Sequence, residues 1–326
     1  MDIVTGSPLW SLQGVRAVIT GSTKGIGLET TKEFLNLGAS VVVVSRSAAD
    51  VTALVADLAA GEGERGREGR VFGCAADVST AEGRAALVAF TAATFGGELD
   101  VLVNNVGVNI RARQEDQTEE EYRTMMRTNL DSCYFLCKEL YPSLVASSSG
   151  ADWTASGGAA GVVRRRGVPA VVNVSSAAGL VSTGTGACYG MTKAAMVQMT
   201  RGLACEWARD GVRVNCVCPW MTMTPMLADA VKDDPSALDK VRAICIYIYI
   251  YYILYTNTLY PSARDKVRAA TPLCNGPAQR LPAPEESAST IAFLCMPAAS
   301  FISGQTVSVD GAFSANGFLG PCVDPS

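Results

Sequence analysis

Short apolar runs alternate with helical patterns along most of this chain. Because consecutive parallel strands need a crossover that is usually a helix, this alternation predicts a parallel sheet with helices on both faces. The alternation favours one α/β domain over residues 1–326, although length alone would allow two. Seven runs have the length and composition of buried strands: 15–20, 40–45, 70–75, 99–104, 170–175, 212–217 and 306–309.

A glycine-rich turn follows the first of these runs directly. Gly21, Gly25 and Gly27 fall between the run at 15–20 and a helical pattern at 28–37. Glycine allows positive φ and close backbone approach, and a helix start offers free N–H groups to a pyrophosphate. The segment therefore predicts a dinucleotide-binding turn. An ordinary tight turn is the alternative, because the spacing differs from G-x-G-x-x-G.

A tyrosine and a lysine one helical turn apart form a candidate catalytic pair. Tyr189 and Lys193 would lie on one face of a helix, where a lysine cation favours the phenolate and makes the phenol a candidate acid. Ser176, at the end of the run 170–175, would add a second hydroxyl donor at a cleft edge. Such a pair also occurs by chance, so it is weak evidence when taken alone.

Three segments in order resemble the motifs of the short-chain dehydrogenase/reductase family. They are the cofactor turn TGSTKGIG at 20–27, NNVG at 104–107, and the Y-x-x-x-K pair from Tyr189 to Lys193. The resemblance covers nearly the whole chain and implies a Rossmann-like, doubly wound, seven-stranded parallel sheet flanked by helices. Further segments resemble the plant tropinone-reductase-like branch, without establishing tropinone as substrate: 10–12, 104–110, 205–208, 219–220 and 293–300.

The resemblance implies a role for each of four catalytic residues. Tyr189 would be the general acid, and Ser176 would orient and polarise a substrate carbonyl. Lys193 would favour the phenolate and hold the nicotinamide ribose. Asn129 would anchor a water in a proton relay, and a surface or capping amide is its alternative role.

The same resemblance implies a set of cofactor-binding residues. Asp77 and Val78 would contact the adenine, Asn105 to Gly107 would line the adenosine ribose side, and Thr222 and Thr224 would bind the carboxamide and phosphates. The full set is Gly21, Thr23, Lys24, Gly25, Ile26, Gly27, Arg46, Asp77, Val78, Asn105, Gly107, Tyr189, Lys193, Thr222 and Thr224.

The end of the second strand indicates which dinucleotide would bind. An NAD enzyme places an acid there on the adenosine ribose hydroxyls, whereas this chain has Arg46. A guanidinium suits a 2′-phosphate, and Lys24 can add a second positive charge. We therefore expect NADPH/NADP⁺; the alternative is that both side chains are solvated surface cations.

Composition and net charge indicate which partners and which cellular compartment to expect. A net charge of −4 and a pI near 5.1 disfavour nucleic acid, and we expect no membrane contact. The 11 cysteines form no C-x-x-C pair, and the chain has no histidine that could share a metal, so we expect no metal site. We expect the cysteines to be reduced thiols of a cytoplasmic protein. Cys205 and Cys295 fall in helical apolar patterns and would be core residues. The amino terminus shows no secretory pattern. The resemblance implies a homodimer or homotetramer.

Two segments depart from the family pattern. Residues 147–168 are rich in Gly, Ala and Ser and predict an inserted flexible loop. Residues 243–268 carry alternating Ile and Tyr inside the expected substrate lid, bracketed by the repeated sequence DKVRA. A TA-dinucleotide repeat encodes that alternation, which favours a gene-model artefact such as retained intron or a duplication. A genuine hydrophobic lid or partner-binding hairpin is the alternative.

Together these features predict an oxidoreductase that transfers hydride between NADP(H) and a small carbonyl or alcohol. The alternative is a catalytically impaired dinucleotide-binding module or a misannotated splice product with a disrupted lid. The residues expected to line the substrate pocket suggest an apolar compound: Val106, Val108, Ile110, Ala178, Leu180, Trp220, Met221 and Met226.

Overall fold

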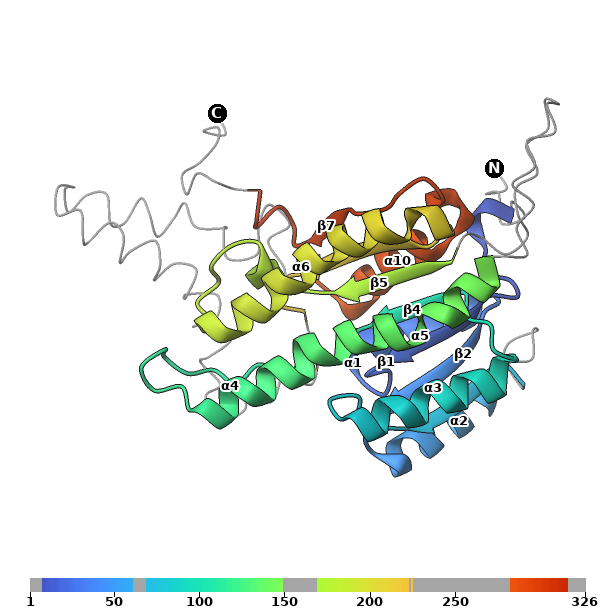
Figure 1. Ribbon diagram of the computed structural model, residues 1–326, viewed down its shortest axis with the longest axis horizontal. Coiled ribbons are helices and arrows are strands. Elements are labelled where there is room, and N and C mark those ends of the chain that lie inside the picture. The colour runs from blue at the N-terminus through green and yellow to red at the C-terminus, as the bar shows by residue number, and fades with distance from the viewer. Residues whose placement is uncertain (1–7, 61–68, 149–168, 223, 225–281, 316–326) are drawn as a thin grey trace.

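The structure is a computed structural model that describes residues 8–60, 69–148, 169–222, 224 and 282–315. Within these ranges the seven expected strands form one parallel sheet in the order β3-β2-β1-β4-β5-β6-β7, which confirms the predicted fold (Figure 1). The strands are β1 (Arg16–Thr20), β2 (Ser40–Ser45), β3 (Val71–Ala75), β4 (Val101–Asn104), β5 (Ala170–Val174), β6 (Arg213–Pro219) and β7 (Thr306–Val309).

Helices cover both faces of this sheet. One face is covered by α1 (Gly25–Asn36), α2 (Ala48–Ala60) and α10 (Pro284–Cys295), and the other by α3 (Ala81–Phe95), α5 (Ser132–Ser148) and α6 (Ala187–Trp207) (Figure 1). The helix α4 (Glu119–Met125) leads through a π-helical turn, η2 (Met126–Asp131), into α5. The short 3₁₀ helices are η1 (Pro8–Trp10), η3 (Ala177–Gly179), η4 (Ala208–Asp210) and η6 (Pro297–Ala299).

The apolar strands supply two hydrophobic cores because successive side chains point to opposite faces. Ile19 of β1 packs in the core that contains Phe34 of α1 and Ile291 of α10. The neighbouring Val18 belongs to the other core, with Leu140 of α5 and Met196 of α6. A strand buried on both faces has no position for a polar side chain, which explains the continuous valine run of β2.

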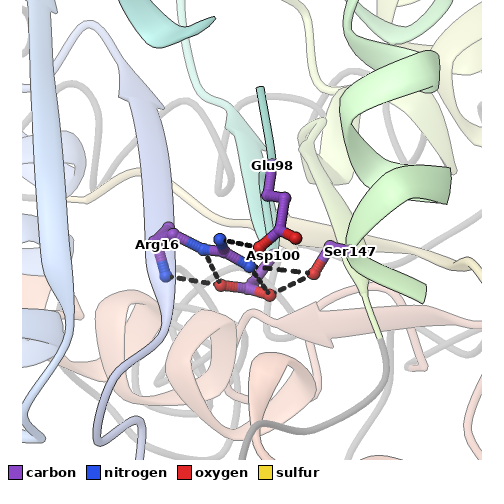
Figure 2. Close-up of polar contacts among 4 residues, drawn as sticks. All are labelled: Arg16, Glu98, Asp100 and Ser147. Carbon is purple, nitrogen blue, oxygen red and sulfur yellow. Dashed lines mark hydrogen bonds and ion pairs between the residues drawn. The ribbon is translucent and has the colours of Figure 1, made fainter. Parts of the chain in front are cut away.

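A buried ion cluster joins β1, β4 and α5 at the amino ends of the strands. The Arg16 guanidinium donates to Asp100 through Nε at 2.8 Å, and it also contacts Glu98 and Ser147 (Figure 2). Burial alone would lower the pKa of Arg16, but its hydrogen bonds and ion pairs with both carboxylates raise it. Because the cleft described below lies at the carboxyl ends, this cluster stabilises the scaffold at a distance from it.

The two inserted segments fall mostly outside the described residues. Helix α5 continues to Ser148, so the first two residues of the expected loop at 147–168 are helical, and residues 149–168 lie outside the described part. The segment 243–268 lies wholly outside it. In the described ranges, no helix is long and apolar enough to cross a membrane, and no group of three or more Cys, Asp or Glu side chains could hold a metal ion.

All cysteines among the described residues are free thiols. The helical pattern predicted that both Cys205 and Cys295 are core residues, and this prediction is wrong for Cys205. Cys295 is buried as expected, with 2% of its surface exposed. Cys205 is exposed, because it lies on the outer side of α6 while its neighbour Ala204 is buried against the sheet. The apolar residues around position 205 indicated a helix, but not which of its faces turns inward.

Candidate active site

A cleft of about 840 Å³ opens at the carboxyl ends of the strands. Its lining includes residues that end or follow β1, β2, β4, β5 and β6. The strand order reverses between β1 and β4, so the connections from these strands diverge to opposite faces of the sheet. Such a switch point leaves a crevice in which α/β proteins bind ligands.

The glycine turn between β1 and α1 is tightly packed at the floor of this cleft. Gly21 and Gly25 have φ values of 64° and 56°, in the left-handed region that favours glycine. A Cβ on Gly27 would lie 2.2 Å from the carbonyl oxygen of Gly21. The turn is therefore shaped for close backbone approach, and α1 begins at Gly25 rather than at residue 28 as predicted. These features fit a dinucleotide pyrophosphate.

Hydrogen bonds from β4 fix this turn. The Asn105 side chain donates through Nδ2 to the carbonyls of Thr20 at 3.0 Å and Gly21 at 3.1 Å. The Thr20 hydroxyl accepts from the backbone N–H of Asn105 at 3.0 Å and donates to Val103. Asn105 thus holds the turn in place as well as lining the cleft.

The two cations expected to select the cofactor lie at the β1–β2 side of the cleft. Arg46 follows β2 and is exposed, and it makes no ion pair among the described residues. Lys24 lies 3.7 Å from the Asp50 carboxylate, and both side chains are largely solvated. Arg46 is therefore the cation that stays free for a phosphate, while Asp50 offsets part of the Lys24 charge.

The structure brings three of the four expected catalytic side chains to one cleft. Ser176 follows β5, and Tyr189 and Lys193 come from the first two turns of α6. Lys193 is 3% exposed, donates through Nζ to the Val174 carbonyl at 2.9 Å, and lies 5.9 Å from the centre of the Tyr189 ring. The Ser176 hydroxyl accepts from the N–H of Ala178 at 3.1 Å, which leaves its own hydrogen available.

Asn129 is buried in the π-helical turn beneath the cleft. Its Oδ1 accepts from the N–H of Val108 at 2.8 Å, and its Nδ2 donates to the Val108 carbonyl at 2.9 Å and to Thr192 at 3.1 Å. It is fully buried, so the alternative of a surface amide is wrong. The bonds join the loop after β4 to the helix that carries Tyr189.

Most of the remaining expected cofactor residues line the cleft. Asp77 and Val78 follow β3, Asn105 and Gly107 follow β4, and Thr222 and Thr224 follow β6, while Ile26 lies in the glycine turn. Thr23, Gly27 and Asn129 are not among the lining residues.

The substrate side of the cleft is more polar than the sequence indicated. Of the expected apolar lining, Val106, Val108, Trp220 and Met221 are present, whereas Ile110, Ala178 and Leu180 do not line the cleft and Met226 lies outside the described residues. The structure adds four polar residues that sequence reasoning missed: Asn109, Arg111, Thr183 and Thr185. Only Asn109 lies in a segment that the resemblance includes, and no residue pattern marks the other three as site residues, so the shared cleft with Tyr189 identifies them.

A crevice at the switch point of a parallel sheet, lined by a glycine turn and a Ser, Tyr and Lys set, defines a class of α/β oxidoreductases. The family model described as short chain dehydrogenase matches residues 16–235 of this chain. The chain therefore belongs to the short-chain dehydrogenase/reductase family, in its plant tropinone-reductase-like branch.

Curated relatives are similar over nearly their full length. A tropinone reductase homolog of Arabidopsis thaliana is 36% identical over 310 residues, which cover 95% of this chain and 96% of the relative. A tropinone reductase homolog of Datura stramonium is 32% identical over 318 residues, which cover 98% of each.

Solved structures share the fold. L-sorbose reductase from Gluconobacter frateurii, complexed with NADPH and L-sorbose, superposes with a TM-score of 0.71 at 25% identity, covering 93% of this chain and 97% of that one. The Pseudomonas aeruginosa RhlG/NADP complex superposes with a TM-score of 0.73 at 24% identity, covering 94% of this chain and 99% of that one.

Proposed function

We propose that this protein transfers hydride between NADP(H) and a small carbonyl or alcohol, with Tyr189 as general acid or base. The observation that carries the proposal is that Ser176, Tyr189 and Lys193 line the same cleft as the glycine turn and Arg46. One crevice thus offers a nucleotide cradle at one side and proton-transfer groups at the other.

When bound, NADPH would supply the hydride. Ser176 donates its free hydroxyl hydrogen to the substrate oxygen and stabilises the charge that develops there. Tyr189 gives its proton to that oxygen, and the buried Lys193 cation stabilises the phenolate that remains. Asn129 fixes the loop at Val108 and the helix at Thr192, so the phenol and the substrate loop keep their relative position.

The preference for NADP(H) over NAD(H) is argued from the positive charge of Arg46. Arg46 follows β2 and lines the cleft, at the strand end where we expect the 2′-phosphate, and it has no ion-pair partner among the described residues. The complexes of L-sorbose reductase with NADPH and of RhlG with NADP support the same choice. The remaining cofactor contacts expected from the sequence, at the glycine turn, Asp77, Val78, Asn105, Gly107, Thr222 and Thr224, belong to this proposal.

The test is NADPH oxidation against a panel of aldehydes and ketones. Tyr189→Phe should lower kcat/KM by roughly 10²-fold or more, the contribution of a positioned acid, and leave the Kd for NADPH within about threefold. Tyr134→Phe, a half-exposed tyrosine of α5, is the matched control and should keep full activity. Tight NADPH binding without turnover of any compound would instead support a dinucleotide-binding module.

The assembly, location and domain boundaries are part of the proposal as well. We expect a homodimer or homotetramer, measured by light scattering, and a cytosolic protein, measured by fractionation; one Arabidopsis thaliana relative is described as chloroplastic. We propose a single domain over 1–326 with an inserted loop at 147–168, and a gene-model artefact at 243–268. Transcript sequence across codons 238–270 decides the last point, since a transcript that encodes the Ile/Tyr segment would refute it.

A further inference from the structure

The charged side chains that line the cleft are mostly cations. The described lining contains four cations, Lys24, Arg46, Arg111 and Lys193, and a single carboxylate, Asp77. On the function proposed above, the cofactor accounts for Lys24, Arg46 and Lys193. Arg111 is left without an assigned partner.

Arg111 lies at the substrate side of the cleft. It is in the loop after β4, two residues beyond Asn109, and the adjacent Ala112 carbonyl lies 3.3 Å from where a Cβ on Gly186 would be. Gly186 is the residue before α6, three positions ahead of Tyr189. The loop that carries Arg111 therefore packs against the start of the catalytic helix, while Lys24 and Arg46 follow β1 and β2.

The Arg111 charge is not neutralised within the described part of the chain. The nearby carboxylate of Glu115 is paired with Arg113 at 3.3 Å, and no ion pair or side-chain hydrogen bond is made by Arg111. Gly186 has positive φ and no side chain, so no capping group offsets the positive end of the 21-residue helix α6. The cleft lining beside α6 therefore offers an exposed cation without an ion-pair partner among the described residues and contains no carboxylate.

An aromatic side chain also lines this cleft. Trp220 is 7% exposed and stacks on Phe313 with ring centres 3.7 Å apart, so its indole is held in place. Its Nε1–H is buried and has no hydrogen-bond partner among the described residues. Because this nitrogen has no accessible surface, the indole offers a bound molecule an apolar surface rather than a hydrogen-bond donor.

We propose that Arg111 selects substrates that carry a carboxylate in addition to the reacting carbonyl. The substrate class is then keto acids and aldehyde acids. A protonated amino ketone would be disfavoured, since its ammonium group would face the Arg111 guanidinium. This inference rests on the proposed function and narrows its substrate class.

The test compares three aldehydes of similar shape: 4-carboxybenzaldehyde, methyl 4-formylbenzoate and 4-(dimethylaminomethyl)benzaldehyde. We expect kcat/KM to be at least roughly tenfold higher for the acid than for the ester, and lowest for the amine. Arg111→Gln should remove the preference for the acid mainly through KM, with the ester changed less than about twofold, and Arg111→Lys should retain most of it. Arg201→Gln, which removes an exposed arginine of α6 that does not line the cleft, is the matched control and should behave as the parent.

A binding measurement separates this inference from the proposed function. Calorimetric titration of 4-methoxybenzoate into the protein with NADP⁺ should give a Kd roughly tenfold lower for the parent than for Arg111→Gln. Reduction of the ester but no preference for the acid would overturn the role of Arg111 and leave the reductase intact. Benzoate binding that depends on Arg111, without turnover of any aldehyde, would overturn the reductase and keep the anion site. Equal benzoate binding by parent and variant would overturn the anion site.

Discussion

The backbone of Gly21 and the α-carbon of Gly27 are in such close contact that no side chain fits between them. A Cβ at position 27 would lie 2.2 Å from the Gly21 carbonyl oxygen and 2.5 Å from Nδ2 of Asn105, the amide that holds that carbonyl. The geometry of the cofactor turn therefore depends on the absence of one methyl group.

Gly27→Ala should disturb this turn, because both atoms that the methyl group meets belong to the turn or to the amide that fixes it. Overpacking of about 1–3 kcal/mol corresponds to NADPH binding that is weaker by roughly tenfold or more. Fluorescence titration of NADPH measures the change. Gly202→Ala is the matched control, since a Cβ there meets nothing within 4 Å in α6, and it should leave the Kd within about twofold. Unchanged binding in Gly27→Ala would contradict a role of this turn in holding the cofactor.

Asp100→Asn should destabilise the fold without changing the cleft. The variant leaves the partly buried Arg16 guanidinium with only Glu98 as an anionic partner, and losing a charged hydrogen-bond partner at a partly buried site costs about 1–3 kcal/mol. Urea unfolding measures the loss, while the Kd for NADPH should stay constant because the cluster is at the opposite ends of the strands. Glu119→Gln breaks an exposed pair with Arg123 and should cost less than about 0.5 kcal/mol. Equal effects of the two substitutions would show that burial does not strengthen the Arg16 cluster.

Ala312→Gly should stabilise the protein. Ala312 has φ of 70°, which makes it the one non-glycine residue with positive φ among the described residues. An L-residue in this region costs roughly 1 kcal/mol, which glycine avoids. Thermal unfolding should therefore show a higher Tm. Ala85→Gly, at an exposed position within α3, should lower the Tm by the loss of helix propensity, and the same sign for both would argue against backbone strain at 312.

Cys205 should react first with a thiol reagent among the eight described cysteines. It is exposed, whereas burial raises the pKa of Cys295 to about 12 and that of Cys133 well above its usual value. The thiolate is the reactive form, so buried thiols with raised pKa values react slowly near neutral pH. Iodoacetamide labelling with peptide mass spectrometry gives the order, and Cys205→Ser should remove the first labelled peptide. Earlier labelling of Cys295 or Cys133 would mean that α10 or α5 opens before the reagent reacts with Cys205.

The sequence by itself determined the seven strands, the glycine turn and the residue types at the catalytic positions. These features depend on local rules: buried strands are apolar runs, a tight turn needs glycine, and Tyr189 and Lys193 share a helix face because they are one turn apart. Only the tertiary structure decided that Cys205 faces outward, that Asn129 brackets Val108, and that Arg111 lies beside the helix of Tyr189. Each of these depends on contacts between segments far apart in the chain, and no local pattern encodes which distant surface a side chain will meet.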